Sequence, residues 1–292
     1  MLINFFLKST PLEYQREILR DFAQSIGGNC IKSEGYEECD VAVIFGSWKK
    51  TPKKKWKIML QHHFTKVNIV ENHRDKPLIV IETPLLGRTI TDKHEYHRVG
   101  LNHFMRGLTD FKNENSPSDR FEKLGLKIKP WRNKGDHVLI VGQNMNDASL
   151  FGIDFAWWVK NTIQHLRRHT DRPIVFRDHP ENKDLMKNLI DTYKWTKQVT
   201  YSNSGTINDD LKNAHCTVAY TSGSSIDSMI AGIPVITCSE YNFLWPISSH
   251  SLEDVETPKL GKRLQTFYDL AWTQWSVNEI QQGKPWEHLI EN

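Results

Sequence analysis

Residues 219–237 read AYTSGSSIDSMIAGIPVIT, a stretch that combines a strand, a polar loop, a short helix and a second strand. Hydroxyl side chains crowd around Gly223 where the first strand gives way to the helix, and Gly232 ends the helix before PVIT. A strand, a helix and a strand in this order predict a parallel β-α-β unit. The free backbone amides and the dipole at the start of such a helix favour an anion.

The same alternation continues on both sides of this stretch. In the second half, the runs HVLIVGQ, PIVFRDHP, CTVAYTS and PVITC predict strands with helices between them. In the first half, residues 2–7 and the runs CDVAVIFGSW and PLIVIETPLLGR predict strands, and residues 11–26 and 64–72 predict helices. Residues 113–134 are polar and contain two prolines, so they are expected to separate the two series.

This organisation predicts an α/β protein with two Rossmann-like lobes whose parallel sheets face a central cleft. The first lobe is expected to comprise residues 1–134 and the second residues 135–258. Residues 259–292 predict a helical segment, with Leu264, Phe267 and Trp275 near one stripe, that can pack back across the cleft.

The composition is that of an ordinary globular protein, since 38% of the 292 residues are hydrophobic and 25% are charged. No apolar run is long enough to span a membrane, and the N-terminus lacks the pattern of a signal peptide. We therefore expect a cytoplasmic protein. The four cysteines show no spacing that indicates a disulfide framework or a structural zinc site.

Charge is distributed unequally along the chain. Residues 1–134 carry 24 Lys and Arg against 16 Asp and Glu, a net charge of +8, whereas residues 135–292 carry 14 against 19, a net charge of −5. This asymmetry predicts that the first half binds a polyanion or an anionic surface.

The densest basic run is KKTPKKKWK, residues 49–57, which holds six Lys and one Trp directly after a predicted strand. Such a run can neutralise DNA phosphates while a Trp stacks on a base. A solvated loop, or contact with an anionic capsule or lipid precursor, is the alternative. The candidate nucleic-acid contacts are Trp48, Lys49, Lys50, Lys53, Lys54, Lys55 and Trp56.

Three loops of the second half follow predicted strands and carry polar side chains. Because the carboxyl ends of parallel strands lie at one edge of a sheet, we expect these loops to form one pocket for a diphosphate or phosphodiester leaving group. Each loop also has an ordinary structural interpretation. The first can be a simple strand-to-helix turn, the histidine of the second can be hydrogen-bonded within the protein, and the third can be a helix N-cap. The candidate ligand-binding residues are Gly142, Gln143, Asp147 and Ser149 in the first loop, Arg177 and His179 in the second, and Ser222, Gly223, Ser224 and Ser225 in the third.

The absence of several known sequence motifs argues against some classes of enzyme. The sequence has no GxxxxGK[ST] and no GxGxxG after its first strand, which argues against a P-loop NTPase and a dinucleotide oxidoreductase. It also lacks a D-x-D triplet, so we expect no bound metal at the sugar-nucleotide site. A helix dipole together with Arg177 and His179 can stabilise the charge of a leaving group without one.

The loops GQNMNDAS, RDHP and TSGSSIDSMIAGIPVIT, in this order, resemble motifs in the second lobe of capsule-polysaccharide glycosyltransferases of the Kdo-transferase type. The tract FLWPISSHSLED is similar to an aromatic segment that follows in that family, so the resemblance covers residues 138–258. It implies a GT-B fold in which the second lobe binds a nucleotide sugar, such as a UDP-sugar or CMP-sugar, and the first lobe binds the acceptor.

A second resemblance concerns the whole chain. The runs DVAVIFGSWKK, IETPLLGR and GKPWEHL are similar to glycosyltransferase-like proteins of tailed phages. This resemblance implies attachment of a sugar to hydroxymethylated pyrimidines in double-stranded phage DNA, carried out in the host cytoplasm.

An inverting transfer requires a base that takes the proton of the acceptor hydroxyl. Glu82, at the end of the strand PLIVIE, is the first candidate, and Asp40 and Asp147 are alternatives. Glu82 can also cap the following segment or pair with Arg88. With Arg177 and His179, Glu82 completes the predicted catalytic set.

Together these features predict a metal-independent, inverting glycosyltransferase, with modified phage DNA ahead of a capsule or envelope glycan as acceptor. The alternative is a different class of function, namely that of a non-catalytic nucleic-acid-binding protein with a degenerate GT-B fold.

Overall fold

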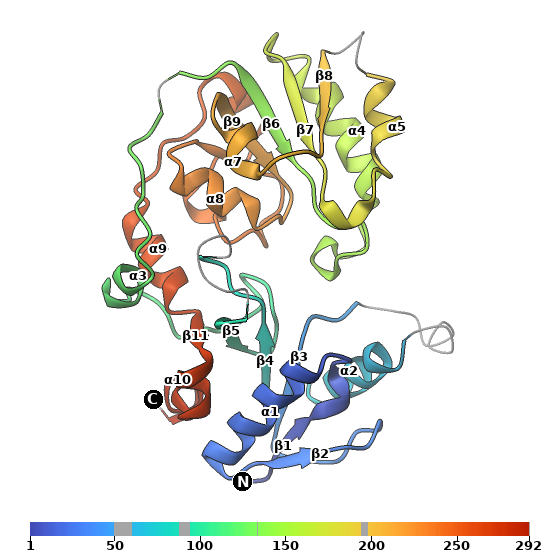
Figure 1. The fold of residues 1–292 in the computed structure, drawn as a ribbon, viewed down its shortest axis with the longest axis vertical. Helices are drawn as coiled ribbons and strands as arrows, with labels where there is room; N and C mark the ends of the chain where they lie inside the picture. The colour runs from blue at the N-terminus through green and yellow to red at the C-terminus, as the bar shows by residue number, and fades with distance from the viewer. Residues whose placement is uncertain (50–59, 88–93, 133, 194–197, 292) are drawn as a thin grey trace. The chain divides into compact units, whose positions relative to one another are not determined.

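The computed structural model describes residues 1–49, 60–87, 94–132, 134–193 and 198–291 (Figure 1). The chain forms two compact units, one made of Met1–Gly125 with Phe267–Asn292 and the other of Leu126–Thr266. The first unit ends at Gly125, ahead of the expected boundary at residue 134. The C-terminal segment is also not a separate piece, because most of it belongs to the first unit.

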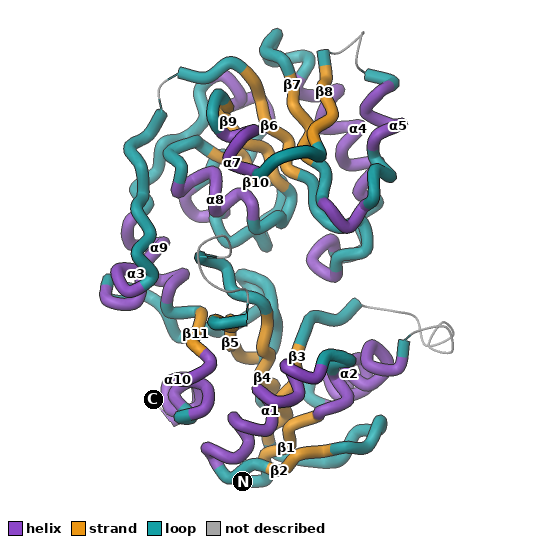
Figure 2. The backbone as a smooth tube through the Cα atoms, in the orientation of Figure 1, coloured by secondary structure: helices purple, strands orange, loops and turns teal. Residues whose placement is uncertain are grey.

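The first unit is built on a six-stranded sheet of order β11-β5-β4-β3-β1-β2 (Figures 1 and 2). The strands β1 to β4 are parallel, β5 is antiparallel to β4, and β11 is antiparallel to β5. The bounds are β1 (Ile3–Phe6), β2 (Asn29–Ile31), β3 (Val41–Phe45), β4 (Leu78–Glu82), β5 (Tyr96–Leu101) and β11 (Gln274–Ser276).

Helix α1 covers this sheet with an apolar face, because Ile18, Leu19 and Phe22 recur at helical spacing and are buried. The C-terminal segment contributes Trp286 to the same core and Trp275 to the sheet. The prediction that Trp275 lies on a helix is therefore wrong, because this residue lies in β11. The helices of this unit are α1 (Glu13–Ile26), α2 (Gln61–Asn72), α3 (Asp119–Lys123), α10 (Val277–Gln281) and α11 (Lys284–Trp286), and α9 (Leu264–Ala271) leads into it.

The second unit has a fully parallel five-stranded sheet of order β10-β9-β6-β7-β8. From β6 the chain builds β7 and β8 on one side and then crosses to build β9 and β10 on the other, so the strand order reverses beside β6 (Figure 2). In sheets of this kind, ligands bind beyond the carboxyl ends of the strands at the reversal. The strands are β6 (His137–Val141), β7 (Ile174–Arg177), β8 (Val199–Ser202), β9 (Ala214–Ala219) and β10 (Val235–Thr237).

Both faces of this sheet are covered. Val138 and Ile140 pack in one core with α4 and α5, whereas Leu139 and Val141 pack in another with α7. Successive residues of a strand point to opposite faces, so a sheet buried on both sides produces the continuous apolar run HVLIV. The helices are α4 (Phe155–Leu166), α5 (Lys187–Asp191), α7 (Ile207–Leu211) and α8 (Ser224–Ile230).

Short 3-10 turns complete the second unit at the ends of strands and helices: η3 (Ala148–Leu150), η4 (Pro180–Asn182), η5 (Trp245–Ile247) and η6 (Leu252–Glu256). Within the ranges that the structure describes, no helix has both the length and the apolar character needed to cross a bilayer.

Candidate functional site

The loops after β6 and β9 are joined by a buried amide. The Nε2 of Gln143 donates to the hydroxyls of Thr221 at 3.0 Å and Ser149 at 3.2 Å. Its Oε1 accepts from the Thr221 backbone amide at 3.1 Å. Gln143 is 3% exposed, so these bonds use the hydrogen-bonding capacity of its side chain inside the protein. The side chains of Gln143 and Ser149 therefore join the two loops and, contrary to expectation, are bonded within the protein.

The loops after β6 and β7 are held together equally closely. The backbone amide of Gly142 donates to the Arg177 carbonyl at 2.7 Å, and a Cβ at residue 142 would lie 2.7 Å from that same oxygen. Buried Asn182 donates through Nδ2 to the Gln143 carbonyl at 3.1 Å and to Asp178 Oδ1 at 2.7 Å. The three loops thus lie against one another at the carboxyl edge of the sheet, and their binding of a phosphate stays a prediction.

In the serine-rich loop, most hydroxyls bond within the protein. Ser222 Oγ donates to the Gly142 carbonyl at 3.1 Å, and Ser225 Oγ donates to the Ser222 carbonyl at 2.8 Å. Across the described part of the chain, the Ser224 hydroxyl and the backbone amides of Gly223 and Ser224 have no hydrogen-bond partner. The hydroxyls of Ser222 and Ser225, two of the predicted ligand-binding residues, are therefore bonded within the protein, and the groups left for a ligand are those of Gly223 and Ser224.

The guanidinium of Arg177, at the end of β7, is bonded to other residues of the protein. Its Nη1 forms an ion pair with Asp210 Oδ2 at 2.9 Å and donates to the Ser204 carbonyl at 2.7 Å. Its Nη2 donates to the Gly205 carbonyl at 2.8 Å. The guanidinium anchors the segment between β8 and α7, so the structure gives no support to phosphate binding by Arg177.

His179 remains available for a ligand. The Glu181 backbone amide donates to its Nδ1 at 3.2 Å, so a neutral imidazole carries its proton on Nε2 and presents a donor there. The half-buried ring has no other hydrogen bond among the described residues. Its backbone amide is fixed by Asp178 Oδ1 at 2.8 Å, and Asp178 Oδ2 accepts from the Tyr201 hydroxyl at 2.8 Å. The sequence offered no signal for the supporting roles of Asp178 and Tyr201.

In the first unit, Glu82 lies at the end of β4 and bonds to the end of β3. Its Oε1 accepts from the Ser47 backbone amide at 2.5 Å, and its Oε2 accepts from the Thr83 amide at 3.0 Å. Both carboxylate oxygens are held, yet the side chain is partly exposed. A strand-end carboxylate in this position can still accept a proton, so its role as base stays a prediction.

Lys66 on α2 is a residue that sequence reasoning missed. Lys66 is 5% exposed. Its Nζ packs against the backbone of Gly46, where φ is +91°, and a Cβ at that residue would lie 2.9 Å from the Nζ. Burial lowers the pKa of Lys66 to about 8, against the charge of Glu82, which raises it. Burial and the Lys66 charge also lower the pKa of His63 to about 4. Lys66 therefore places a buried amine near the candidate base.

The alternative bases, Asp40 and Asp147, each accept a hydrogen bond from a backbone amide. Asp40 precedes the amino end of β3 and accepts from the Leu2 amide at 2.6 Å, so it lies at the opposite end of that strand from Ser47. Asp147 caps η3 by accepting from the Ser149 amide at 2.8 Å. Both carboxylates therefore have local structural roles, and their use as a base stays a prediction.

Most of the basic run lies outside the described residues, namely Lys50, Lys53, Lys54, Lys55 and Trp56. Lys49 is exposed. The ring of Trp48 packs edge-on against His103 and Phe104, with ring centroids 4.9 Å apart in each pair. DNA binding by this segment stays a prediction.

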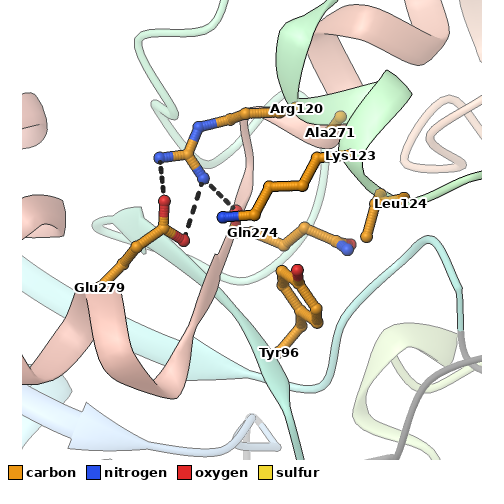
Figure 3. A pocket seen from close by; sticks show the side chains of 7 residues that line it. All are labelled: Tyr96, Arg120, Lys123, Leu124, Ala271, Gln274 and Glu279. Carbon is orange, nitrogen blue, oxygen red and sulfur yellow. Dashed lines mark hydrogen bonds and ion pairs between the residues drawn. The ribbon is translucent and has the colours of Figure 1, made fainter.

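A pocket of the first unit is shown in Figure 3. The Arg120 guanidinium donates to both carboxylate oxygens of Glu279, at 2.9 and 3.4 Å, and lies 3.9 Å from the ring centroid of Trp275. The cavity measures about 10 Å³, which is room for about one water molecule. Arg120 thus joins α3 to β11 and α10, and the pocket is too small for a sugar or a nucleotide.

No family model matches this chain, and no curated protein does. Solved structures do match. A KpsC β-Kdo 2,7 transferase from Thermosulfurimonas dismutans has a TM-score of 0.54 at 14% identity, over 97% of this chain and 98% of that one. A KpsC β-Kdo 2,4 transferase from the same organism has a TM-score of 0.54 at 12% identity, over 96% and 98%.

The chain has a GT-B-like fold. The expected fold class and the likeness to the Kdo-transferase type are confirmed at this level, because the match extends over nearly the full length of both chains. A UDP-GlcNAc 2-epimerase from Methanocaldococcus jannaschii matches with a TM-score of 0.31, too low to support an argument. The resemblance to phage DNA-modifying glycosyltransferases stays a prediction.

Proposed function

We propose that this protein is a glycosyltransferase that moves a sugar from a nucleotide-sugar donor to a hydroxyl acceptor. The observation that carries the proposal is the joining of three strand-end loops at the reversal of strand order. There, His179 Nε2, the Ser224 hydroxyl and the amides of Gly223 and Ser224 have no partner among the residues that the structure describes. The GT-B-like fold supports it, since structures with this fold include the two Kdo transferases.

In the proposed reaction, the acceptor oxygen forms a bond to the anomeric carbon while the bond from that carbon to the donor phosphate breaks. The phosphate leaves with the electron pair as an anion. His179 Nε2–H and the donors of Gly223 and Ser224 would stabilise the developing charge without a metal ion. Glu82 would take the proton of the acceptor hydroxyl, which fits inversion at the anomeric carbon.

The acceptor is the less defined partner. The two similar structures are named as Kdo transferases, which favours a capsule or envelope glycan over DNA. The second candidate is DNA with hydroxymethylated pyrimidines, which is favoured by the six lysines of residues 49–57 and the net charge of +8 over residues 1–134.

The first experiment measures thermal stabilisation of the full chain by a panel of UDP- and CMP-sugars, followed by donor hydrolysis. A ligand at a hundred times its dissociation constant adds about 2.7 kcal/mol to the free energy of unfolding. We expect one nucleotide class to stabilise the protein and His179→Ala to abolish turnover. Lys160→Ala, an exposed change on α4, is the control.

Two outcomes distinguish the alternatives. Transfer to a lipid-linked glycan, or to hydroxymethylcytosine DNA with mass spectrometry of the nucleosides, identifies the acceptor. Inertness towards every nucleotide sugar, combined with tight and salt-sensitive DNA binding, would instead identify a non-catalytic binding protein.

A further inference from the structure

Three potential metal ligands of the second unit lie together away from the donor loops. His165 lies in the last turn of α4, His169 lies in the turn that follows this helix, and Glu253 lies in η6. One ligand atom from each lies within 4.8 Å of the others. We propose that these three side chains bind a divalent transition-metal ion, with Zn²⁺ as the best chemical match.

The chemistry of the donor set supports this assignment. Zn²⁺ binds imidazole nitrogen and carboxylate oxygen at about 2.0–2.2 Å, and three protein ligands leave one position for water. The turn after α4 brings His169 back beside His165. The two imidazole rings are 5.1 Å apart between centroids and tilted by 33°. Hard cations such as Mg²⁺ prefer oxygen ligands, so they are poor matches.

The three side chains are not committed elsewhere. Apart from the contact between the two rings, none of them has a hydrogen bond or ion pair with another residue in the described ranges. The carbonyl end of a helix also carries partial negative charge, which favours a cation at the end of α4.

Packing fixes the backbone that carries these ligands. Val255 of η6 is fully buried in the same core as Ile163 and Leu166 of α4, so η6 lies against the helix. Arg172 pairs with Glu256 at 3.0 Å and adds a second link between the two segments. Side-chain rotation alone can then bring the three ligand atoms to a common ion. An open hollow of about 480 Å³ beside His169 provides access for water.

Neighbouring charges do not oppose the ion. Residues 167–172 contain three arginines, whereas Asp171, Glu253, Asp254 and Glu256 bring four carboxylates to the same region. Arg167 donates to the carbonyls of Thr170 and Arg172, and Arg172 is paired with Glu256. The carboxylates therefore balance the arginines.

This metal would be structural and would not participate in sugar transfer. Helix α4 has 12 residues and is therefore about 18 Å long, with its N-terminus next to the loop after β6, His165 in its last turn and His169 just beyond it. A bound ion would tie η6 to α4 and stabilise the second unit. The inference is independent of the proposed function.

The test is a Zn²⁺ titration by calorimetry on untagged, chelator-treated full-length protein, with Co²⁺ absorption as a probe of ligand geometry. We expect one ion per chain, and roughly tenfold or greater loss of affinity in His165→Gln, His169→Gln and Glu253→Gln, because each removes a ligand. The neighbouring change Asp254→Asn removes the same charge as Glu253→Gln and should leave the affinity unchanged.

The melting temperature in excess chelator checks that each variant is folded, and it should match that of the parent. The proposal is overturned if Zn²⁺ does not bind, or if any one of the three ligand variants binds it as tightly as the parent. Equal losses in Asp254→Asn and Glu253→Gln would also contradict it, because the effect would then come from general charge.

Discussion

Replacing Gln143 with leucine removes the side chain that joins the loops after β6 and β9. The change deletes the donations to Thr221 and Ser149 and leaves the buried Thr221 backbone amide without its acceptor. Each buried hydrogen bond contributes about 1 kcal/mol net, and an unsatisfied buried group costs about 1–3 kcal/mol. The two hydroxyls still bond to each other at 3.0 Å, so the total loss should be about 3 kcal/mol.

A loss of this size is easily measured. For a unit of about 140 residues, each kcal/mol lowers the melting temperature by roughly 3–5 °C, so Gln143→Leu should melt about 10 °C below the parent. Urea unfolding should show a lower midpoint with an unchanged slope. Because the same network positions the serine-rich loop, stabilisation by the nucleotide sugar should also disappear.

The matched control is Gln164→Leu. This glutamine lies on α4, is half buried and makes no side-chain hydrogen bond among the described residues, so its replacement should change stability by less than about 0.5 kcal/mol. If Gln143→Leu melted within 2 °C or so of this control and kept ligand binding, the network would not hold the loops, and the reasoning would be refuted.

Arg177→Met should reduce the free energy of unfolding by about 1–3 kcal/mol, because Asp210 loses its ion pair and keeps only the Ser202 hydroxyl, while nucleotide affinity measured by calorimetry stays unchanged; a large loss of affinity alone would restore the phosphate-binding role. Gly142→Ala should cost about 1–3 kcal/mol in urea unfolding, because its Cβ would press on the Arg177 carbonyl, and a neutral result would contradict that close approach. The pKa of Lys66 falls from 10.5 to about 8 on folding, so the unfolded chain binds more protons between these values. Relative to Lys66→Met, the parent should therefore gain up to about 3 kcal/mol as pH rises from 8 to 10.5, and a flat difference would count against the buried amine.

Long apolar or periodic segments were predictable from sequence. The strands β6, β7, β9 and β10 of the second unit and helices α1 and α4 occur where the sequence predicts them, because the decisive interactions are local or arise from burial on both sheet faces. The short strands β2, β5, β8 and β11 were missed. Their residues become strands only by pairing with distant partners, as Trp275 does with His97 of β5.

The candidate site was predicted to the level of loops and not of atoms. The order of motifs brought the loops after β6, β7 and β9 together, since parallel strands end at one edge. The sequence could not distinguish Arg177, which is paired with Asp210, from His179, whose Nε2 is free of partners among the described residues. Nor could it distinguish Ser224 from its bonded neighbours Ser222 and Ser225.

The sequence by itself determined the α/β class, the two series of strands and helices and the positions of the polar loops, because hydrophobic periodicity and turn chemistry depend on neighbours along the chain. Only the tertiary structure decided which polar groups are satisfied internally, which remain for a ligand, and that Lys66 is buried near Glu82. Those outcomes depend on hydrogen-bond geometry and desolvation between segments far apart in sequence, which no local pattern encodes.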